Sequence, residues 1–122
     1  MNWTVKIDLI EDWLDEQDEG VRADVAIAIE RLETHGPTLG RPWVDRIQGS
    51  CIHNLKELRP AAEPGMEVRI LFVFDPLRRA ILLVAGDKAS GKSNARKWNG
   101  WYRSAIPRAE RTYAKYLEKE GL

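Results

Sequence analysis

The sequence has few of the residues from which disulfide frameworks and metal sites are built. It contains one cysteine, Cys51, and two histidines, His35 and His53, in 122 residues. One cysteine cannot form a disulfide within the chain, so the chain is compatible with a reducing compartment such as the cytoplasm. Two histidines without clustered acids make no metal site, and no Ser-His-Asp arrangement is apparent. We therefore expect no metal and no other cofactor.

Long apolar runs are also missing, since no apolar segment approaches the length that spans a membrane. The first twenty residues alternate in polarity and then become acidic, which is the reverse of the basic-then-apolar order of a secretory signal peptide. We therefore expect a cytoplasmic protein without membrane contact. A chain of 122 residues is expected to form one domain over residues 1–122, with residues 95–122 as a C-terminal helical tail.

The net charge is zero because 19 acidic and 19 basic side chains balance, but the two signs are separated along the chain. Residues 1–33 hold ten acids and three bases, a net charge of −7, whereas residues 88–115 hold eight bases and one acid, a net charge of +7. Aromatic residues lie among these basic side chains. This combination is typical of protein surfaces that bind the phosphate backbone of a nucleic acid and stack on its unpaired nucleobases. The alternative is that the two charged segments are solvated or pack against each other. The candidate RNA-binding residues are Lys56, Lys92, Arg96, Lys97, Trp98 and Tyr102.

Hydrophobic periodicity predicts the first elements of the fold. Residues 3–9 alternate apolar and polar side chains, as an edge strand does. Residues 11–20 are expected to form a short helical turn. Residues 21–36 have apolar side chains at steps of three and four before Gly36 and Pro37, which predicts an amphipathic helix. Residues 38–50 are expected to form a loop with at most one turn, and a last helix is expected from about residue 101, interrupted at Pro107.

Three further segments, 52–60, 67–75 and 79–87, are predicted strands. The connections between them are too short for a crossover helix, so the strands must form an antiparallel meander. The resulting order, β-α-α-β-β-β-α, predicts an α+β domain in which the helices pack on one face of a small, mainly antiparallel sheet.

Residues 86–93, GDKASGKS, satisfy the pattern G-x-x-x-x-G-K-[ST] of a nucleotide-binding P-loop. A P-loop ordinarily follows the first strand of a parallel sheet, whereas residues 79–87 belong to the predicted meander and no strand pattern follows Ser93. We interpret the motif as a chance match and expect no nucleotide cofactor.

The predicted strand 67–75 has an arginine in its interior. Its even-numbered residues form an apolar face that helices should cover, and Arg69 lies on the other face. An arginine in that position is costly to bury unless it is paired. Two interpretations remain open: a structural ion pair with Glu57 of the neighbouring strand, or a site for phosphate, which a guanidinium group binds with two parallel hydrogen bonds.

Four sequence features occur together in the segments LETHGPTLGRPWVDRIQGSCIHNLKELRP and EVRILFVFDPLRRAILLVAGDKASG. They are a helix that ends at a Leu-x-x-x-Gly turn, a strand that ends in Glu57-Leu58-Arg59, the strand Val68 to Phe72, and an apolar strand that leads into the lysine loop at Lys88. This combination, over about residues 20–117, resembles the RelE/HigB superfamily of type II toxins, and within it the phage-derived Gp49-like HigB branch.

The resemblance implies a RelE-like fold and a metal-independent endoribonuclease that cleaves mRNA, usually on the ribosome, and so inhibits translation. It also implies a cognate antitoxin, of the HigA-like helix-turn-helix kind, that keeps the toxin inactive. RNA cleavage needs a base for the ribose 2′-hydroxyl, cations for the transition state and an acid for the leaving oxygen. Arginine suits only the second role, and Glu57 or a lysine could be the base. The candidate catalytic residues are Arg69, Arg59, Lys88, Glu57 and His53.

Two other functions are compatible with the same residues. A ParE-like toxin shares the fold and poisons gyrase, and a non-enzymatic nucleic-acid-binding module would use the same basic segment. Sequencing RNA 5′ ends after induction separates these possibilities, because only the ribonuclease creates new mRNA ends.

Overall fold

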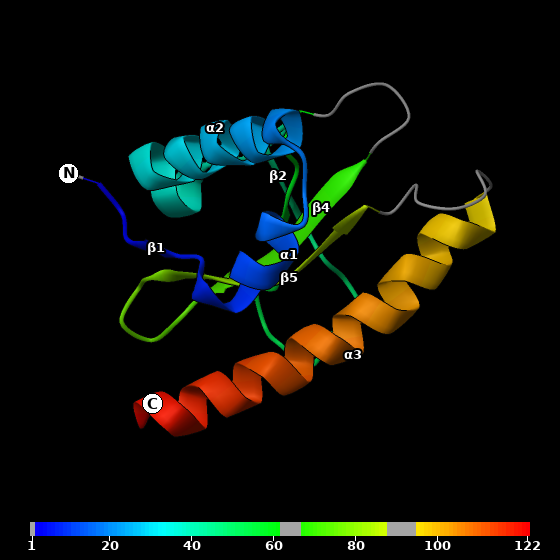
Figure 1. The fold of residues 1–122 in the computed structure, drawn as a ribbon. Helices are drawn as coiled ribbons and strands as arrows, with labels where there is room; N and C mark the ends of the chain where they lie inside the picture. Colours follow the sequence, from blue (N-terminus) through cyan, green and yellow to red (C-terminus); the bar gives the residue numbers. More distant parts are fainter. Residues whose placement is uncertain (1, 62–66, 88–94) are drawn as a thin grey trace.

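The computed structural model describes residues 2–61, 67–87 and 95–122, without the side chains of 95–99. A five-stranded sheet lies between two long helices, one on each side (Figure 1). The elements are β1 (Val5–Lys6), the 3₁₀ turn η1 (Asp8–Ile10), α1 (Glu11–Asp15), α2 (Glu19–His35), the 3₁₀ turn η2 (Gly36–Thr38), β2 (Val44–Arg46), β3 (Lys56–Leu58), β4 (Val68–Phe74), β5 (Ala80–Asp87) and α3 (Ala95–Glu120).

The strand order is β1-β5-β4-β3-β2. Strands β2 to β5 pair in antiparallel fashion, and β1 adds a short parallel edge beside β5. The predicted meander and the α+β class are therefore confirmed. The structure adds β2, a three-residue strand in the segment that was expected to be a loop. Backbone pairing with β3 holds the short β2 in place. Residues 44–46 are too few to show a hydrophobic period, so the sequence did not predict this strand.

Helix α2 covers one face of the sheet, as predicted. The Asp18 side chain accepts a hydrogen bond of 2.9 Å from the Val21 backbone N–H, which caps the first turn. The helix ends at Gly36, whose φ of 57° is accessible to glycine at little cost. The buried side chains of α2 pack against the apolar side chains of β4 that face it. These residues are Val21, Val25, Ala28 and Leu32 of α2 and Val68, Ile70 and Phe72 of β4.

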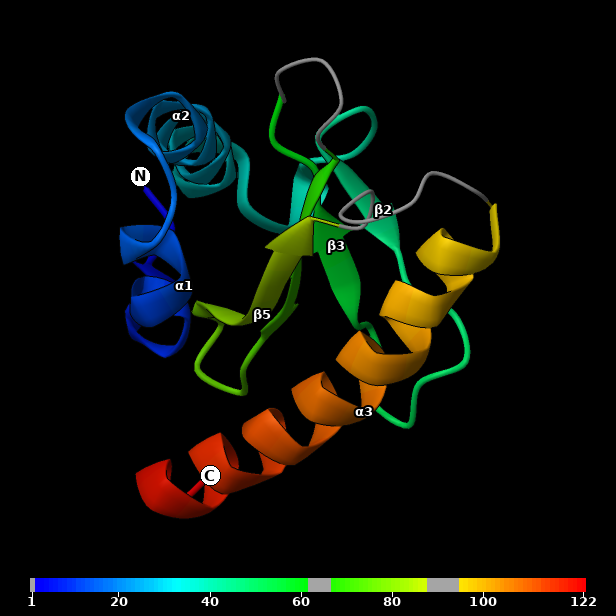
Figure 2. The same ribbon diagram turned by 45° about the vertical axis from the view of Figure 1, so that its right-hand side comes forward.

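Helix α3 covers the opposite face, so the expectation that the helices pack on one face is wrong (Figure 2). Beyond Arg69, the odd-numbered side chains Leu71 and Val73 are apolar, and they form a second core with Ala105 and Ala109 of α3. The pairing register with β4 shifts at a bulge in β5, so the consecutive residues Leu83 and Val84 both belong to this core. Two apolar faces require two covering layers, and α3 supplies the second.

Helix α3 continues through Pro107, so the expected interruption there is also wrong. A proline inside a helix removes one backbone hydrogen bond, here the bond to the carbonyl four residues earlier, that of Arg103. Both Pro107 and Arg103 are exposed, so water can hydrate that carbonyl. Ala105 and Ala109 are buried on either side of the proline, and their packing holds the helix against the sheet.

Candidate active site

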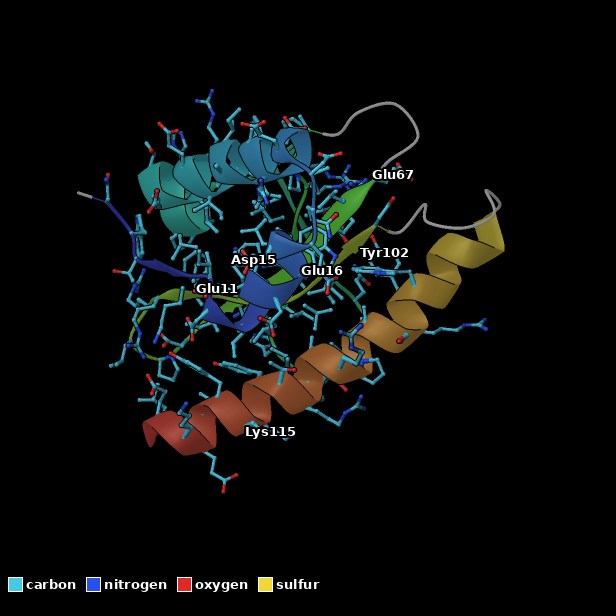
Figure 3. The ribbon with its side chains drawn as sticks, in the orientation of Figure 1. Glu11, Asp15, Glu16, Glu67, Tyr102 and Lys115 are labelled. Atoms are coloured by element: carbon cyan, nitrogen blue, oxygen red, sulfur yellow. The ribbon has the colours of Figure 1, made fainter. Side chains whose placement is uncertain are left out.

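The candidate active site lies on the α3 side of the sheet, where β3 and β4 bring charged side chains next to α3. Glu57 of β3 lies opposite Leu71 of β4, so Glu57 and Arg69 project from the same face. Arg59 follows two residues after Glu57 and extends this face toward the edge strand β2. Tyr102 approaches from α3 and lies on the side of that helix that faces the sheet (Figure 3).

Glu57 is the centre of this cluster and is 5% exposed. Its Oε1 atom lies 3.3 Å from Nε of Arg59 and 3.3 Å from Nε of Arg69. Its Oε2 atom accepts a hydrogen bond of 2.8 Å from the Tyr102 hydroxyl. A buried carboxylate thus lies between two guanidinium groups and a phenol, which together offset the cost of its burial.

Arg69 is almost as buried, at 8% exposure. Besides its ion pair with Glu57, its Nη1 donates to the Val68 carbonyl at 2.8 Å and its Nη2 lies 3.6 Å from Glu67 Oε1. The ion pair that the sequence offered as a structural alternative is therefore formed in the structure. The same guanidinium also faces the candidate active site, so it can serve both the fold and the chemistry.

Further acids balance the exposed side of the cluster. Asp45 lies 2.9 Å from Arg41 and 4.0 Å from Arg59. The backbone N–H of Arg46 and the nearby arginines hold the pKa of Asp45 below its usual value, against a smaller opposing effect of burial. With Asp45, Glu57 and Glu67 against three arginines, these side chains carry no excess positive charge.

Trp101 and Tyr102 of α3 close the site from above the sheet, with their rings 5.0 Å apart in an edge-to-face contact. Burial, followed by the charge of Glu57 and the hydrogen bond to it, raises the pKa of Tyr102 well above its usual value. The Trp101 indole lies against Gly86, where a β-carbon would come within 2.5 Å of the indole nitrogen. Gly86 is the first residue of the P-loop-like pattern. Its close packing against Trp101 explains why this position holds a glycine without any role in binding a nucleotide.

A shallow groove of about 410 Å³ borders the site along α3. Tyr102 belongs to both, and the groove continues past Arg103 and Ile106 to Glu110. The Glu110 carboxylate accepts hydrogen bonds from the Ser50 hydroxyl at 2.8 Å and from the Cys51 backbone N–H at 2.9 Å. The loop before β3 is therefore fixed to α3 at the far end of this groove.

The structure brings together four of the residues that the sequence singled out: Glu57, Arg59, Arg69 and Tyr102. It places two others elsewhere. His53 is exposed in the turn before β3 and lines a different pocket, and the Lys56 side chain lies on the α2 side of the sheet. Lys88 and Lys92 lie outside the described residues, as do the side chains of Arg96, Lys97 and Trp98 in the first turns of α3.

Sequence reasoning missed Asp45 and Glu67. Asp45 lies on β2, whose existence the sequence did not announce, although its position opposite Glu57 follows once that strand is known. Glu67 precedes β4 and lies two residues before Arg69. That spacing in the sequence could have predicted that the two side chains share a face of the sheet.

Within the described part of the chain, no group of three His, Cys, Asp or Glu side chains is placed to hold a metal ion. None of the described helices combines the length and the apolar character that crossing a membrane requires.

Comparison with known proteins adds independent information. A model of the family described as phage derived protein Gp49-like matches residues 12–114. A Mycobacterium tuberculosis protein named "Putative toxin HigB2" is 44% identical over 117 residues, which are 96% of this chain and 55% of that protein. A second protein of that organism, named "Putative toxin HigB3", is 46% identical over 111 residues, which are 91% of this chain and 90% of that protein. The chain thus spans about half of the first relative and nearly all of the second.

Proposed function

Because this chain belongs to the phage-derived Gp49-like family, we propose that it is the toxin of a toxin–antitoxin pair. Two relatives that align with nearly all of the chain bear toxin names. The proposed activity is cleavage of mRNA on the ribosome, which inhibits translation. The observation that carries this proposal is the arrangement of Glu57 between Arg59 and Arg69 on one face of the sheet.

The arrangement suits attack of a ribose 2′-hydroxyl on the adjacent phosphate. Glu57 takes the hydroxyl proton, the bond from O2′ to phosphorus forms, and the bond from phosphorus to O5′ breaks, leaving a 2′,3′-cyclic phosphate. Arg69 and Arg59 stabilise the extra negative charge on the phosphoryl oxygens of the transition state. Neither arginine can exchange a proton near neutral pH, so their role is electrostatic.

Tyr102 fits a positioning role better than that of the acid. Its raised pKa makes it a weak proton donor to the leaving oxygen. Its hydrogen bond of 2.8 Å fixes the orientation of the Glu57 carboxylate. Lys88 follows β5 and lies outside the described residues. The sequence names it as a candidate catalytic residue without a role, and we propose that it donates the proton to O5′.

Access to the site sets a condition on RNA binding. Glu57 and Arg69 are 5% and 8% exposed, whereas the Arg59 side chain is 31% exposed. We therefore expect RNA to enter from the Arg59 edge and along the groove at Tyr102. The 2′-hydroxyl would then approach the Glu57 carboxylate while the Tyr102 hydroxyl keeps its hydrogen bond to Oε2.

The proposed partner that silences the toxin is a cognate antitoxin of the HigA-like helix-turn-helix kind. Helices α1 and α2 carry most of the acidic segment, and Glu11, Asp15 and Glu16 lie exposed on or just after α1 (Figure 3). This acidic surface is separate from the candidate active site. An antitoxin with a basic docking segment could therefore bind there and silence the toxin by making the complex too bulky for the ribosome, or it could cover the site itself.

The test is induction of the protein followed by sequencing of RNA 5′ ends. Wild type should generate new mRNA ends in register with the reading frame, and Glu57→Gln and Arg69→Lys should reduce their number about a hundredfold. Arg41→Lys, which changes an exposed arginine paired with Asp45, is the matched control and should cleave like wild type. DNA breaks without new RNA ends would instead show a gyrase poison, and binding without either kind of cleavage would show a non-enzymatic module.

A further inference from the structure

A second cationic pocket lies on the opposite side of the sheet from the candidate active site. It has a volume of about 300 Å³ and lies between β2, β3, β4 and the turn that follows β4. We call it the Lys56 pocket. It is lined by Pro37, Arg46, Asn54, Lys56, Phe74 and Arg78.

Two of its cations are adjacent because of strand pairing. Arg46 of β2 lies opposite Lys56 of β3, so both side chains project from the α2 side, away from Glu57. Lys56 Nζ lies 3.5 Å from the Pro37 carbonyl oxygen and 5.6 Å from the centre of the Phe74 ring. These contacts restrain a side chain that would otherwise sample many rotamers.

The third cation is fixed by an aromatic contact. The Arg78 guanidinium lies 5.2 Å from the centre of the Trp3 ring, and Trp3 itself packs edge-on against Phe74 at 5.9 Å. Lys56 is thus held over Phe74 and Arg78 over Trp3, and the two rings contact each other. Phe74 lines the pocket, so an aromatic surface lies beside its positive charges.

No described side chain neutralises the charge of the Lys56 pocket. Within the described part of the chain, no carboxylate lines this pocket or forms an ion pair with Arg46, Lys56 or Arg78. Burial and then the positive charge of Arg46 lower the pKa of Lys56. The candidate active site differs, because there each arginine has an acidic partner. An anion in the Lys56 pocket would relieve a repulsion that the described side chains leave uncompensated.

We propose that the Lys56 pocket binds a phosphate group of an RNA backbone. Two guanidinium groups and an ammonium group supply the charge-assisted hydrogen bonds that phosphate oxygens accept, and the pocket has no base-reading groups apart from Asn54. Strand β2 is the edge of the sheet, so one RNA can contact Arg59 on one side of this edge and Arg46 on the other. This inference rests on the proposed action on RNA, and it adds a phosphate contact away from the scissile bond.

The experiment measures how tightly the full chain binds a short single-stranded 2′-O-methyl RNA, which lacks the proton that the proposed reaction removes. Affinity is followed by fluorescence anisotropy over a series of salt concentrations. The test variant is Arg46→Gln/Lys56→Gln. The charge-matched control is Arg22→Gln/Lys119→Gln, which changes two exposed cations that do not line the pocket. The test variant should bind about tenfold more weakly than wild type, and its salt slope should fall by about 0.7 for the lost phosphate contact. The control should bind within about twofold of wild type.

Equal weakening in the two double variants would overturn the proposal, since it would show only an effect of net charge. Unchanged RNA affinity in the test variant, combined with lost antitoxin binding, would also overturn it and would assign the pocket to a protein partner. If inorganic phosphate saturates the pocket in calorimetry while RNA affinity is the same in both variants, the pocket takes free phosphate and the RNA assignment fails. Cleavage of unmodified RNA by wild type is measured separately. Pocket-dependent binding without cleavage would refute the ribonuclease and retain the pocket.

Discussion

The Tyr102 hydroxyl donates a hydrogen bond of 2.8 Å to Glu57, a residue 45 positions earlier in the chain. This contact joins α3 to β3 and makes the covering helix part of the candidate site. It also means that the group proposed as the base is held by a residue that packs on the second core. The stability of the fold and the orientation of Glu57 are therefore coupled through one side chain.

Replacement of Tyr102 by phenylalanine should expose this coupling. Tyr102→Phe leaves a buried carboxylate oxygen without its donor, which should cost about 1.5–3 kcal/mol in the free energy of unfolding. The pKa of Tyr102 is raised in the folded state, so its contribution to stability is present below about pH 10 and is lost as pH rises through the folded pKa. Urea unfolding should therefore show a weaker alkaline decline for Tyr102→Phe than for wild type. Tyr113→Phe, which removes another hydroxyl from α3, is the control and should cost less near neutral pH.

The contact between Gly86 and Trp101 gives a second prediction. A β-carbon at position 86 would meet the Trp101 indole at 2.5 Å, so Gly86→Ala should destabilise the protein by about 1–3 kcal/mol. The same substitution in a Trp101→Ala background should cost little, and a double-mutant cycle in urea unfolding measures that difference. Gly100→Ala is the control, because a β-carbon there meets open space within α3. It should stabilise the helix by about 0.5–1 kcal/mol. Additive costs of the Gly86 and Trp101 substitutions would contradict the proposed contact.

The sequence was sufficient for the elements whose apolar spacing is regular. Val21, Val25 and Leu32 lie on one face of α2, and Gly36 ends it, so both the helix and its buried side were predictable. The short connections between the last three strands forced the meander. Once the strands were known, the shared face of Glu57 and Arg69 followed from the alternation of side chains.

The rest depended on tertiary contacts. Strand β2 is three residues long and exists through its pairing with β3. Helix α3 tolerates Pro107 because packing on both sides of the proline outweighs the lost hydrogen bond. The apolar odd-numbered residues Leu71 and Val73 indicate a second covered face. Arg69 on the same face indicates the opposite, because arginine side chains are mostly exposed. Without α3 on that face, the hydrogen bond from Tyr102 to Glu57 could not be predicted.

The far end of α3 is held by a buried polar network, which yields a prediction about acid stability. The Asp75 carboxylate accepts a hydrogen bond of 2.7 Å from the Tyr116 hydroxyl and lies 2.7 Å from Nη2 of Arg79. Burial acts to raise the pKa of Asp75, but the hydrogen bonds from Arg79 and Tyr116 outweigh it and leave the pKa below its usual value. The stability that this carboxylate contributes is thus present above about pH 4 and is lost as pH falls through the folded pKa.

Asp75→Asn should therefore lower the free energy of unfolding by about 1.5–3 kcal/mol near neutral pH, because it removes the charge from the hydrogen bonds that Arg79 and Tyr116 donate. The difference from wild type should shrink as pH falls, when the wild-type carboxyl also becomes protonated. Urea unfolding at several pH values measures both effects. Asp12→Asn, at an exposed position of α1, is the control and should follow the wild-type curve. A constant difference at all pH values would contradict the assigned role of the Asp75 charge.

The last prediction separates the two roles of Arg69. Arg69→Ala would leave the 5% exposed Glu57 with one guanidinium fewer and would open a void in the sheet, so it should cost about 3–5 kcal/mol in stability. Loss of activity in that variant would therefore not identify a catalytic residue. Arg69→Lys keeps the positive charge beside Glu57 but lacks the planar fork that binds two phosphoryl oxygens.

We expect Arg69→Lys to lose less stability than Arg69→Ala in thermal unfolding, while RNA cleavage falls about a hundredfold, as expected when about 2.7 kcal/mol of transition-state stabilisation is removed. Cleavage is measured as the rate of appearance of new 5′ ends on a defined mRNA with protein well below saturation. Arg41→Lys, at a side chain that is 76% exposed, controls for the change of arginine to lysine near the same edge. If Arg69→Lys unfolds like Arg69→Ala, or if it cleaves RNA at the wild-type rate, then Arg69 is a structural partner of Glu57 and the transition-state charge must be met by other residues.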